Sequence, residues 1–200
     1  MDILIIRHGQ SEADILNVIE GRANFNLTEL GRKQAKAMAD WVKENYSINK
    51  IYSSPLNRAK QTAEYVSKVY GIDIIFDDDL MEWKNGLIAG LKPEEALKKY
   101  PEPKRFPHTR VYEQESIIDF RMRAETILSK IINENKDDDT IVIVSHSGMI
   151  NMLFRSFIES STNSDISIKS GDTGIHYWKI NSGKKSIQFC NKNEHIKNII

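Results

Sequence analysis

The sequence contains a single cysteine, Cys190, in 200 residues. One cysteine cannot form an intrachain disulfide or build a cysteine-rich metal site, so the fold must depend on burial and hydrogen bonds. An excess of charge of one sign is also missing, because 28 Lys and Arg residues balance 28 Asp and Glu residues. Without a global basic field, the chain is not expected to bind nucleic acid or an anionic membrane.

Long hydrophobic runs are absent as well. The N-terminal run at residues 3–6 (ILII) ends at Arg7, which is too short for a signal peptide, and it lacks a basic flank and a cleavage site. No other stretch approaches the length that spans a bilayer. Repeats and low-complexity segments are missing too, and 40% of the residues are hydrophobic. We therefore expect residues 1–200 to form one domain in a reducing cytoplasm.

Short apolar runs alternate along the chain with helical patterns, which is typical of an α/β domain with a largely parallel sheet. The runs that predict strands are residues 3–6, 51–53, 72–76 and 140–145, with a C-terminal hairpin of residues 175–180 and 186–190. Helical spacing predicts helices from Thr28 to about residue 45, from Pro55 to about residue 70, from Gln114 over about five turns, and from Met149 to about residue 158. Of the helix starts, Thr28 is expected to be an N-cap, and Ser54-Pro55 an N-cap with proline at N1.

Residues 81–113 are less regular than the rest. Pro93, Pro101, Pro103 and Pro107 interrupt short helical pieces there. This segment is expected to be an excursion from the core that covers a site. Its aromatic and basic residues either select a leaving group or serve only as packing and solvated surface.

Basic side chains and imidazoles follow the predicted strands at their C-terminal ends, where chemistry gathers in open α/β sheets. Arg7-His8 follows the first strand, Arg58 lies in the first turn of a helix after the second, and His146 follows the strand at residues 140–145. Guanidinium groups match phosphoryl oxygens, and an imidazole can act as a donor or a nucleophile. The cluster therefore predicts a concentrated positive site for one phosphoryl group.

Several segments, in order, resemble the histidine phosphatase superfamily, also called the phosphoglycerate mutase-like family. Residues 7–12 (RHGQSE) are similar to its RHG motif, residues 53–63 (SSPLNRAKQTA) to its second arginine motif, and residues 144–148 (VSHSG) to its late histidine motif. Further matches are residues 21–35, residues 80–82 (LME) with Gly86 and Gly90, and Glu115-Ser116. The resemblance implies a three-layer α/β/α fold, with a mostly parallel central sheet, helices on both faces and an antiparallel edge strand.

The resemblance also implies a phosphohistidine mechanism of the phosphatase branch, which needs no metal and no cofactor. His8 would attack phosphorus through an unprotonated nitrogen while its other nitrogen donates to a fixed acceptor. Arg7, Arg58 and His146 would bind the phosphoryl oxygens. Glu82 would protonate the leaving oxygen and then deprotonate the attacking water.

The chain departs from the family pattern at a few positions. Asp14 stands where the family often has Asn, and its carboxylate would repel a dianion unless it turns away or is neutralised. Asn17 is then a candidate phosphate-binding residue, or a plain loop amide. Asn24 stands where Asp is frequent, and Ser147 replaces a common Gly and is a second candidate for phosphate binding.

Three functions remain open for such a chain. Its length, and the absence of a Trp-containing loop after the RHG motif, favour a phosphomonoester hydrolase acting on a small phosphorylated metabolite. The alternatives are a cofactor-dependent phosphoglycerate mutase and a non-catalytic module that binds a phosphorylated ligand. A metallophosphatase is disfavoured because the sequence has no local ligand cluster with suitable spacing.

Overall fold

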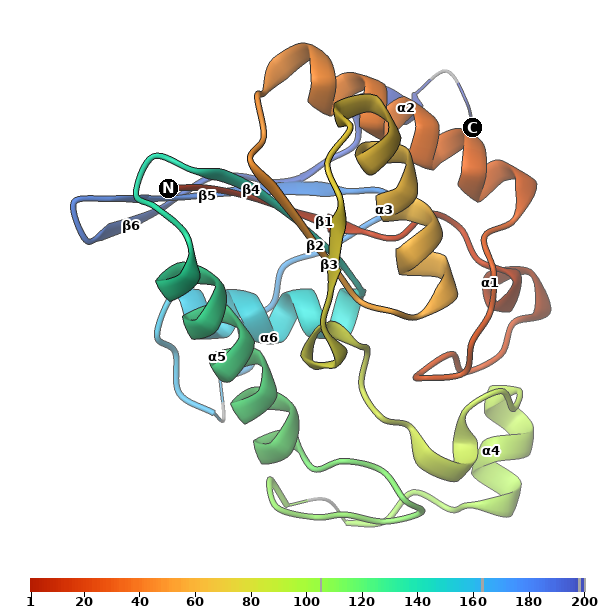
Figure 1. The fold of residues 1–200 in the computed structure, drawn as a ribbon. Coiled ribbons are helices and arrows are strands. Elements are labelled where there is room, and N and C mark those ends of the chain that lie inside the picture. The colour runs from red at the N-terminus through yellow and green to blue at the C-terminus, as the bar shows by residue number, and fades with distance from the viewer. Residues whose placement is uncertain (105, 163, 198, 200) are drawn as a thin grey trace.

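The computed structural model describes residues 1–104, 106–162, 164–197 and 199, and its centre is one six-stranded sheet (Figure 1). The strand order is β3-β2-β4-β1-β5-β6. The first four strands are parallel, β5 pairs antiparallel with β1, and β6 pairs antiparallel with β5. The strands are β1 (Asp2–Arg7), β2 (Lys50–Ser53), β3 (Ile74–Phe76), β4 (Thr140–Ser145), β5 (Ile175–Asn181) and β6 (Lys184–Lys192). The mostly parallel sheet and the C-terminal hairpin predicted from the sequence are confirmed.

Helices cover both faces of this sheet, as Figure 1 shows for α2 and α3 on one side and α5 and α6 on the other. The β1 side chains alternate between the two cores: Ile3 and Ile5 pack toward α5 and α6, whereas Leu4 and Ile6 pack toward α2 and α3. Burial on both faces explains the continuous apolar run. The helices are α1 (Glu12–Leu16), α2 (Glu29–Asn45), α3 (Asn57–Tyr70), α4 (Pro93–Lys99), α5 (Ile117–Glu134) and α6 (Ser147–Phe157).

Of the four predicted helix starts, the one at Thr28 is confirmed and three are wrong. Thr28 caps α2, accepting from the backbone N–H of Gly31 at 2.9 Å. Helix α3, however, begins at Asn57 after an N-cap at Leu56, because the N–H of Ser54 extends the sheet by donating to the Val144 carbonyl at 3.0 Å. Helix α5 begins at Ile117, after its N-cap Ser116, and not at Gln114. Helix α6 begins at Ser147, two residues before the predicted start at Met149, and His146 is its N-cap.

Residues 81–113, apart from residue 105, carry only α4 and a 3-10 turn at Gly86–Ile88. Figure 1 shows α4 at the end of the molecule away from the sheet. Two backbone hydrogen bonds tie this excursion to the loop after α1, since Ile19 donates to Leu91 at 2.9 Å and Gly90 donates to Ile19 at 2.7 Å. None of the helices in the described residues is long and apolar enough to cross a membrane.

Candidate active site

The two histidines of the predicted cluster meet at the C-terminal edge of the sheet. Strands β1 and β4 pair in parallel with Arg7 opposite Ser145, so His8 and His146 leave neighbouring strands at the same level. The His8 N–H donates to the Ser145 carbonyl at 3.0 Å, and the two imidazole ring centroids lie 5.1 Å apart. Parallel pairing thus brings together two residues that are far apart in the sequence.

The hydrogen bonds of His8 define which of its nitrogens carries the proton. Nδ1 lies 2.8 Å from the Gly9 carbonyl, which can only accept, so Nδ1 is the protonated nitrogen. Nε2 therefore keeps its lone pair, and Arg58 Nε donates to it at 3.2 Å. Burial, followed by the charges of Arg58 and Arg7, holds the pKa of His8 well below its ordinary value. The imidazole is neutral and presents an unprotonated nitrogen.

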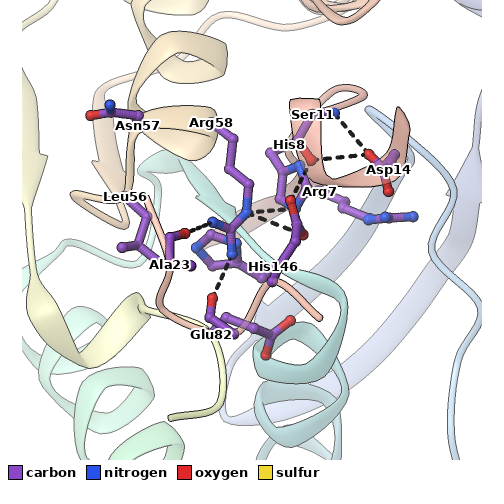
Figure 2. A network of polar contacts seen from close by, with 12 residues as sticks. Arg7, His8, Ser11, Asp14, Ala23, Leu56, Asn57, Arg58, Glu82 and His146 are labelled. Atoms are coloured by element: carbon purple, nitrogen blue, oxygen red, sulfur yellow. Dashed lines mark hydrogen bonds and ion pairs between the residues drawn. The ribbon is translucent and has the colours of Figure 1, made fainter. Parts of the chain in front are cut away.

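Arg58 is completely buried and is oriented by the loop between α1 and α2. Its two terminal nitrogens donate to the carbonyls of Ala23 at 3.0 Å and Gly21 at 2.8 Å, which leaves Nε facing His8 (Figure 2). Because α3 starts at Asn57, Arg58 lies in its first turn, as the sequence predicted. Two backbone carbonyls therefore fix the plane of the guanidinium group beside the imidazole.

His146 is buried as the N-cap of α6 and is held from one side only. Its Nε2 lies 2.8 Å from the hydroxyl oxygen of Ser54, whereas its Nδ1 has no hydrogen-bond partner among the described residues. Burial, followed by the charge of Arg58, holds the pKa of His146 well below its ordinary value. A buried ring nitrogen without a partner is costly in a protein interior, so this nitrogen is suited to contact a ligand.

Glu82 approaches the site from the segment after β3, where its carboxylate meets the N-terminus of α6. One oxygen accepts from the Gly148 N–H at 2.9 Å and the other from the Trp83 N–H at 2.8 Å. Arg123 of α5 holds the same turn by donating to the carbonyls of Met81 at 2.6 Å and Glu82 at 3.2 Å. These two backbone N–H groups hold the Glu82 carboxyl group in place at the start of α6.

Arg7 ends β1 with only part of its guanidinium group engaged. Its Nη1 donates to the Ser170 carbonyl at 2.9 Å and lies 3.3 Å from a carboxylate oxygen of Asp172. Its Nε is buried without a hydrogen-bond partner among the described residues. Arg7 and His146 thus each leave a nitrogen available to a bound group.

The other predicted or questioned site residues, Asp14, Asn17 and Ser147, lie on α1 and α6. Asp14 is exposed, and its carboxylate accepts from the Ser11 N–H at 2.7 Å in the capping box of α1. Asn17 is exposed at the opposite end of α1, with a φ of 51° that suits asparagine at a helix end. Ser147 is the half-buried first residue of α6. Asp14 caps the start of α1, and Asn17 lies outside the contacts that unite the cluster.

Sequence reasoning missed a carboxylate within the cluster. Glu20 Oε2 lies 3.4 Å from Arg58 Nε and 3.7 Å from His8 Nε2, and its other oxygen lies in hydrogen-bond contact with the Ser11 hydroxyl. It lies in a loop without periodicity, so only the folding of that loop around Arg58 brings it to the site. The site is therefore less purely positive than the sequence predicted.

The arrangement joins a neutral imidazole, whose unprotonated Nε2 accepts from Arg58, to two guanidinium groups and a carboxylate at a helix N-terminus. Guanidinium groups stabilise anionic oxygens, while the imidazole can attack the atom that bears them. The part of the chain that the structure describes contains no group of three or more His, Cys, Asp or Glu side chains placed to hold a metal ion.

The chain is similar over most of its length to several known proteins. The chain is 29% identical over 204 residues to phosphoglycerate mutase-like protein 4 of Arabidopsis thaliana, covering 98% of this chain and 87% of the relative. It is 30% identical over 150 residues to phosphoserine phosphatase 1 of Hydrogenobacter thermophilus, covering 72% and 70%. The structure of a phosphoserine phosphatase mutant from Entamoeba histolytica, in complex with phosphoserine, superposes with a TM-score of 0.77 at 27% identity, covering 98% of each chain.

A family model matches nearly the whole chain. The model describes branch 1 of the histidine phosphatase superfamily, and the match extends over residues 3–193, from β1 into the segment after β6. This range includes every residue of the cluster. The chain belongs to the histidine phosphatase superfamily.

Proposed function

We propose that the chain is a metal-independent phosphomonoester hydrolase that acts through a phosphohistidine intermediate on His8, with Glu82 as the general acid and base. The observation that carries this proposal is the state of His8. Its Nδ1 proton is directed to the Gly9 carbonyl, and its Nε2 lone pair faces the guanidinium group of Arg58. A nucleophile needs this tautomer, and an attacked phosphoryl group needs a cation at this position.

The reaction would proceed in two balanced steps. In the first, the bond from His8 Nε2 to phosphorus forms, the ester P–O bond breaks, and protonated Glu82 gives its proton to the leaving oxygen. In the second, a water oxygen bonds to phosphorus, the N–P bond breaks, and Glu82 accepts the proton of that water. Arg7, Arg58 and His146 would stabilise the charge on the equatorial oxygens in both transfers.

The substrate class that we propose is a small phosphorylated metabolite. The named relatives include phosphoserine phosphatases, and one solved structure of such an enzyme contains 3-phosphoglyceric acid. We also propose that residues 1–200 act as one domain in which residues 81–113 cover the site. The hydrogen bonds of Ile19 and Gly90 support this arrangement, because they fasten the excursion to the loop that holds Arg58.

Trapping the intermediate tests this mechanism. We expect acid-labile, alkali-stable phosphate on the wild-type protein after a brief reaction with labelled substrate, and none on His8→Ala, which should also lose turnover. His108→Ala is the matched control, since this exposed imidazole stacks on Phe106 and has no contact with the cluster. Undiminished turnover in His8→Ala would refute the mechanism, and activity that disappears with EDTA would contradict metal independence.

A mutase activity is the alternative that the Arabidopsis relative's name favours. It is separated from hydrolysis by incubation with 3-phosphoglycerate and 2,3-bisphosphoglycerate. We expect release of inorganic phosphate without isomerisation, whereas rapid isomerisation with little phosphate release would identify a mutase. Binding of phosphorylated ligands without any turnover would identify a non-catalytic module.

A further inference from the structure

The carboxylate of Glu20 lies where a bound phosphoryl group would be expected. One of its oxygens is 3.4 Å from Arg58 Nε and 3.7 Å from His8 Nε2. These are the two nitrogens that would attract and attack a phosphoryl group. The side chain of Glu20 is only 18% exposed, so water does little to weaken its interactions. A ligand that enters this space must either displace Glu20 or make contact with it.

Charged and titratable groups surround Glu20 from several elements. Two cations attract its ionised form, while a second carboxylate opposes it; the imidazoles are neutral. The cations are Arg7 at the end of β1 and Arg58 on α3, and the second carboxylate is Asp14 on α1. The imidazoles are His8 after β1 and His146 at the start of α6. The charge of Glu82 acts on Arg58. The cations do not prevail, because burial, the largest influence, raises the pKa of Glu20.

The hydroxyl group of Ser11 lies between the carboxylates of Glu20 and Asp14. Its oxygen lies in hydrogen-bond contact with Glu20 Oε1 and is 3.2 Å from Asp14 Oδ2. A hydroxyl has one hydrogen and so can donate to only one of two carboxylates. Both contacts are satisfied when Glu20 is protonated and donates to Ser11 Oγ, which then donates to Asp14. The arrangement therefore accommodates a neutral Glu20.

The two protonation states of Glu20 have opposite consequences for a phosphate. A neutral carboxylic acid can donate a hydrogen bond to a phosphoryl oxygen, as carboxyl groups kept protonated in apolar sites do. An ionised carboxylate at the same place repels a phosphate and neutralises Arg58, on which phosphate binding depends.

We propose that Glu20 is a further phosphoryl-binding residue that works as a neutral acid: protonated, it donates to a phosphoryl oxygen, and ionised, it pairs with Arg58 and closes the site to phosphate. The inference rests on the proposed function, because it takes the phosphoryl site to lie between His8 and Arg58. It assigns to this chain a binding residue that none of its recognised motifs contains.

The test measures the affinity of inorganic phosphate by calorimetry from pH 5 to pH 8, without any need for turnover. Glu20→Gln keeps a donor but cannot ionise, and Glu20→Ala has neither property. Glu29→Gln is the matched control, because the Glu29 side chain is 88% exposed at the start of α2, where it pairs with Lys33 one turn later. Comparison with wild type at each pH cancels the titration of phosphate itself and of the groups common to both proteins.

We expect Glu20→Gln to match wild type at pH 5 and to bind phosphate about tenfold more tightly, or better, at pH 8, since a repelling charge is gone. Glu20→Ala should bind about fivefold more weakly than wild type at pH 5, for want of one hydrogen bond, and more tightly at pH 8. The proposal would be overturned if the ratio of the phosphate affinities of wild type and Glu20→Gln were the same at every pH. So would phosphate binding by neither protein.

The two proposals fail separately in this design. Should wild type bind phosphate with the expected pH dependence but hydrolyse no phosphomonoester, the hydrolase proposal would fall while the role of Glu20 would stand. Should wild type hydrolyse phosphomonoesters while the affinity ratio stays flat, only the role of Glu20 would fall.

Discussion

At the scale of single residues, the position of Glu82 depends on the missing side chain of Gly148. A Cβ atom added at Gly148 would lie 2.3 Å from Glu82 Oε1, closer than two such atoms can approach. The Glu82 carboxylate is the free end of a flexible side chain, so it would move while the backbone stayed in place. The sequence shows a glycine two residues after His146, but only the fold shows that the distant Glu82 packs against it.

We therefore predict that Gly148→Ala leaves the fold intact but reduces kcat/KM about 100-fold, because a displaced catalytic group costs about this much. The free energy of unfolding, measured in urea, should change by less than about 1 kcal/mol, since alanine is favoured in a helix. A double-mutant cycle is the control: on a Glu82→Ala background, Gly148→Ala should cause no further loss of activity. Equal losses on both backgrounds would show that Gly148 acts independently of Glu82.

At the scale of elements, the start of α2 packs directly on the loop that follows β1. A Cβ atom at Gly31 would lie 2.1 Å from the backbone oxygen of Gln10, and one at Gly9 would lie 2.6 Å from the backbone oxygen of Gly31. These are backbone atoms, which cannot swing away as a side chain does. The sequence predicted α2 and its cap from spacing and from Thr28, yet the contact with the loop that carries His8 depends on how the helix is docked.

In Gly31→Ala, helix propensity and the close contact with Gln10 have opposite effects on stability. Helix propensity alone would have Gly31→Ala stabilise the protein by about 1 kcal/mol. The close approach to Gln10 reverses that sign, and we expect destabilisation of about 1–3 kcal/mol in urea unfolding, together with reduced activity through the displaced His8 loop. Lys33→Ala, whose side chain is 65% exposed on the same helix, should change stability by less than about 0.5 kcal/mol. A stabilised Gly31→Ala would contradict the packing of α2.

At the scale of the whole molecule, the fold keeps several histidines neutral. Burial lowers the pKa values of His8, His146, His176 and His195, with His176 and His195 at about 4. A histidine whose folded pKa lies below its unfolded value of 6.5 binds protons more readily in the unfolded chain. Its contribution to stability is complete above pH 6.5 and is lost as the pH falls toward the folded pKa.

His176 offers the clearest test of this effect, because it is fully buried and lies outside the cluster around His8. Protonation of the unfolded state should cost wild type roughly 2 kcal/mol at this residue between pH 7 and pH 5. His176→Gln should lose less stability than wild type over the same interval, by about this amount, whatever its stability at pH 7. Glu20 and Asp172, with raised pKa values, act in the opposite direction, but equally in both proteins. If His176→Gln keeps the wild-type pH dependence of stability, His176 is not the source of this effect.

The sequence by itself determined most of the framework. Continuous apolar runs predict strands buried on both faces, because only such strands exclude polar residues from both sides, and β4 (Thr140–Ser145) begins and ends where its run does. Motif spacing likewise predicts that Arg7, His8, Arg58 and His146 share a site, since they follow strands whose C-terminal ends meet at one edge.

Tertiary structure decided what happens between these residues. Ser54 was predicted to be a helix cap, yet its hydroxyl contacts His146, because pairing of β2 with β4 sets the backbone there. The tautomer of His8 follows from the Gly9 carbonyl and Arg58, which no local pattern specifies. Glu20 reaches the same nitrogens only because its loop closes over Arg58. Local patterns depend on neighbouring residues, whereas protonation and charge at a buried site depend on every group that the fold brings within a few ångströms.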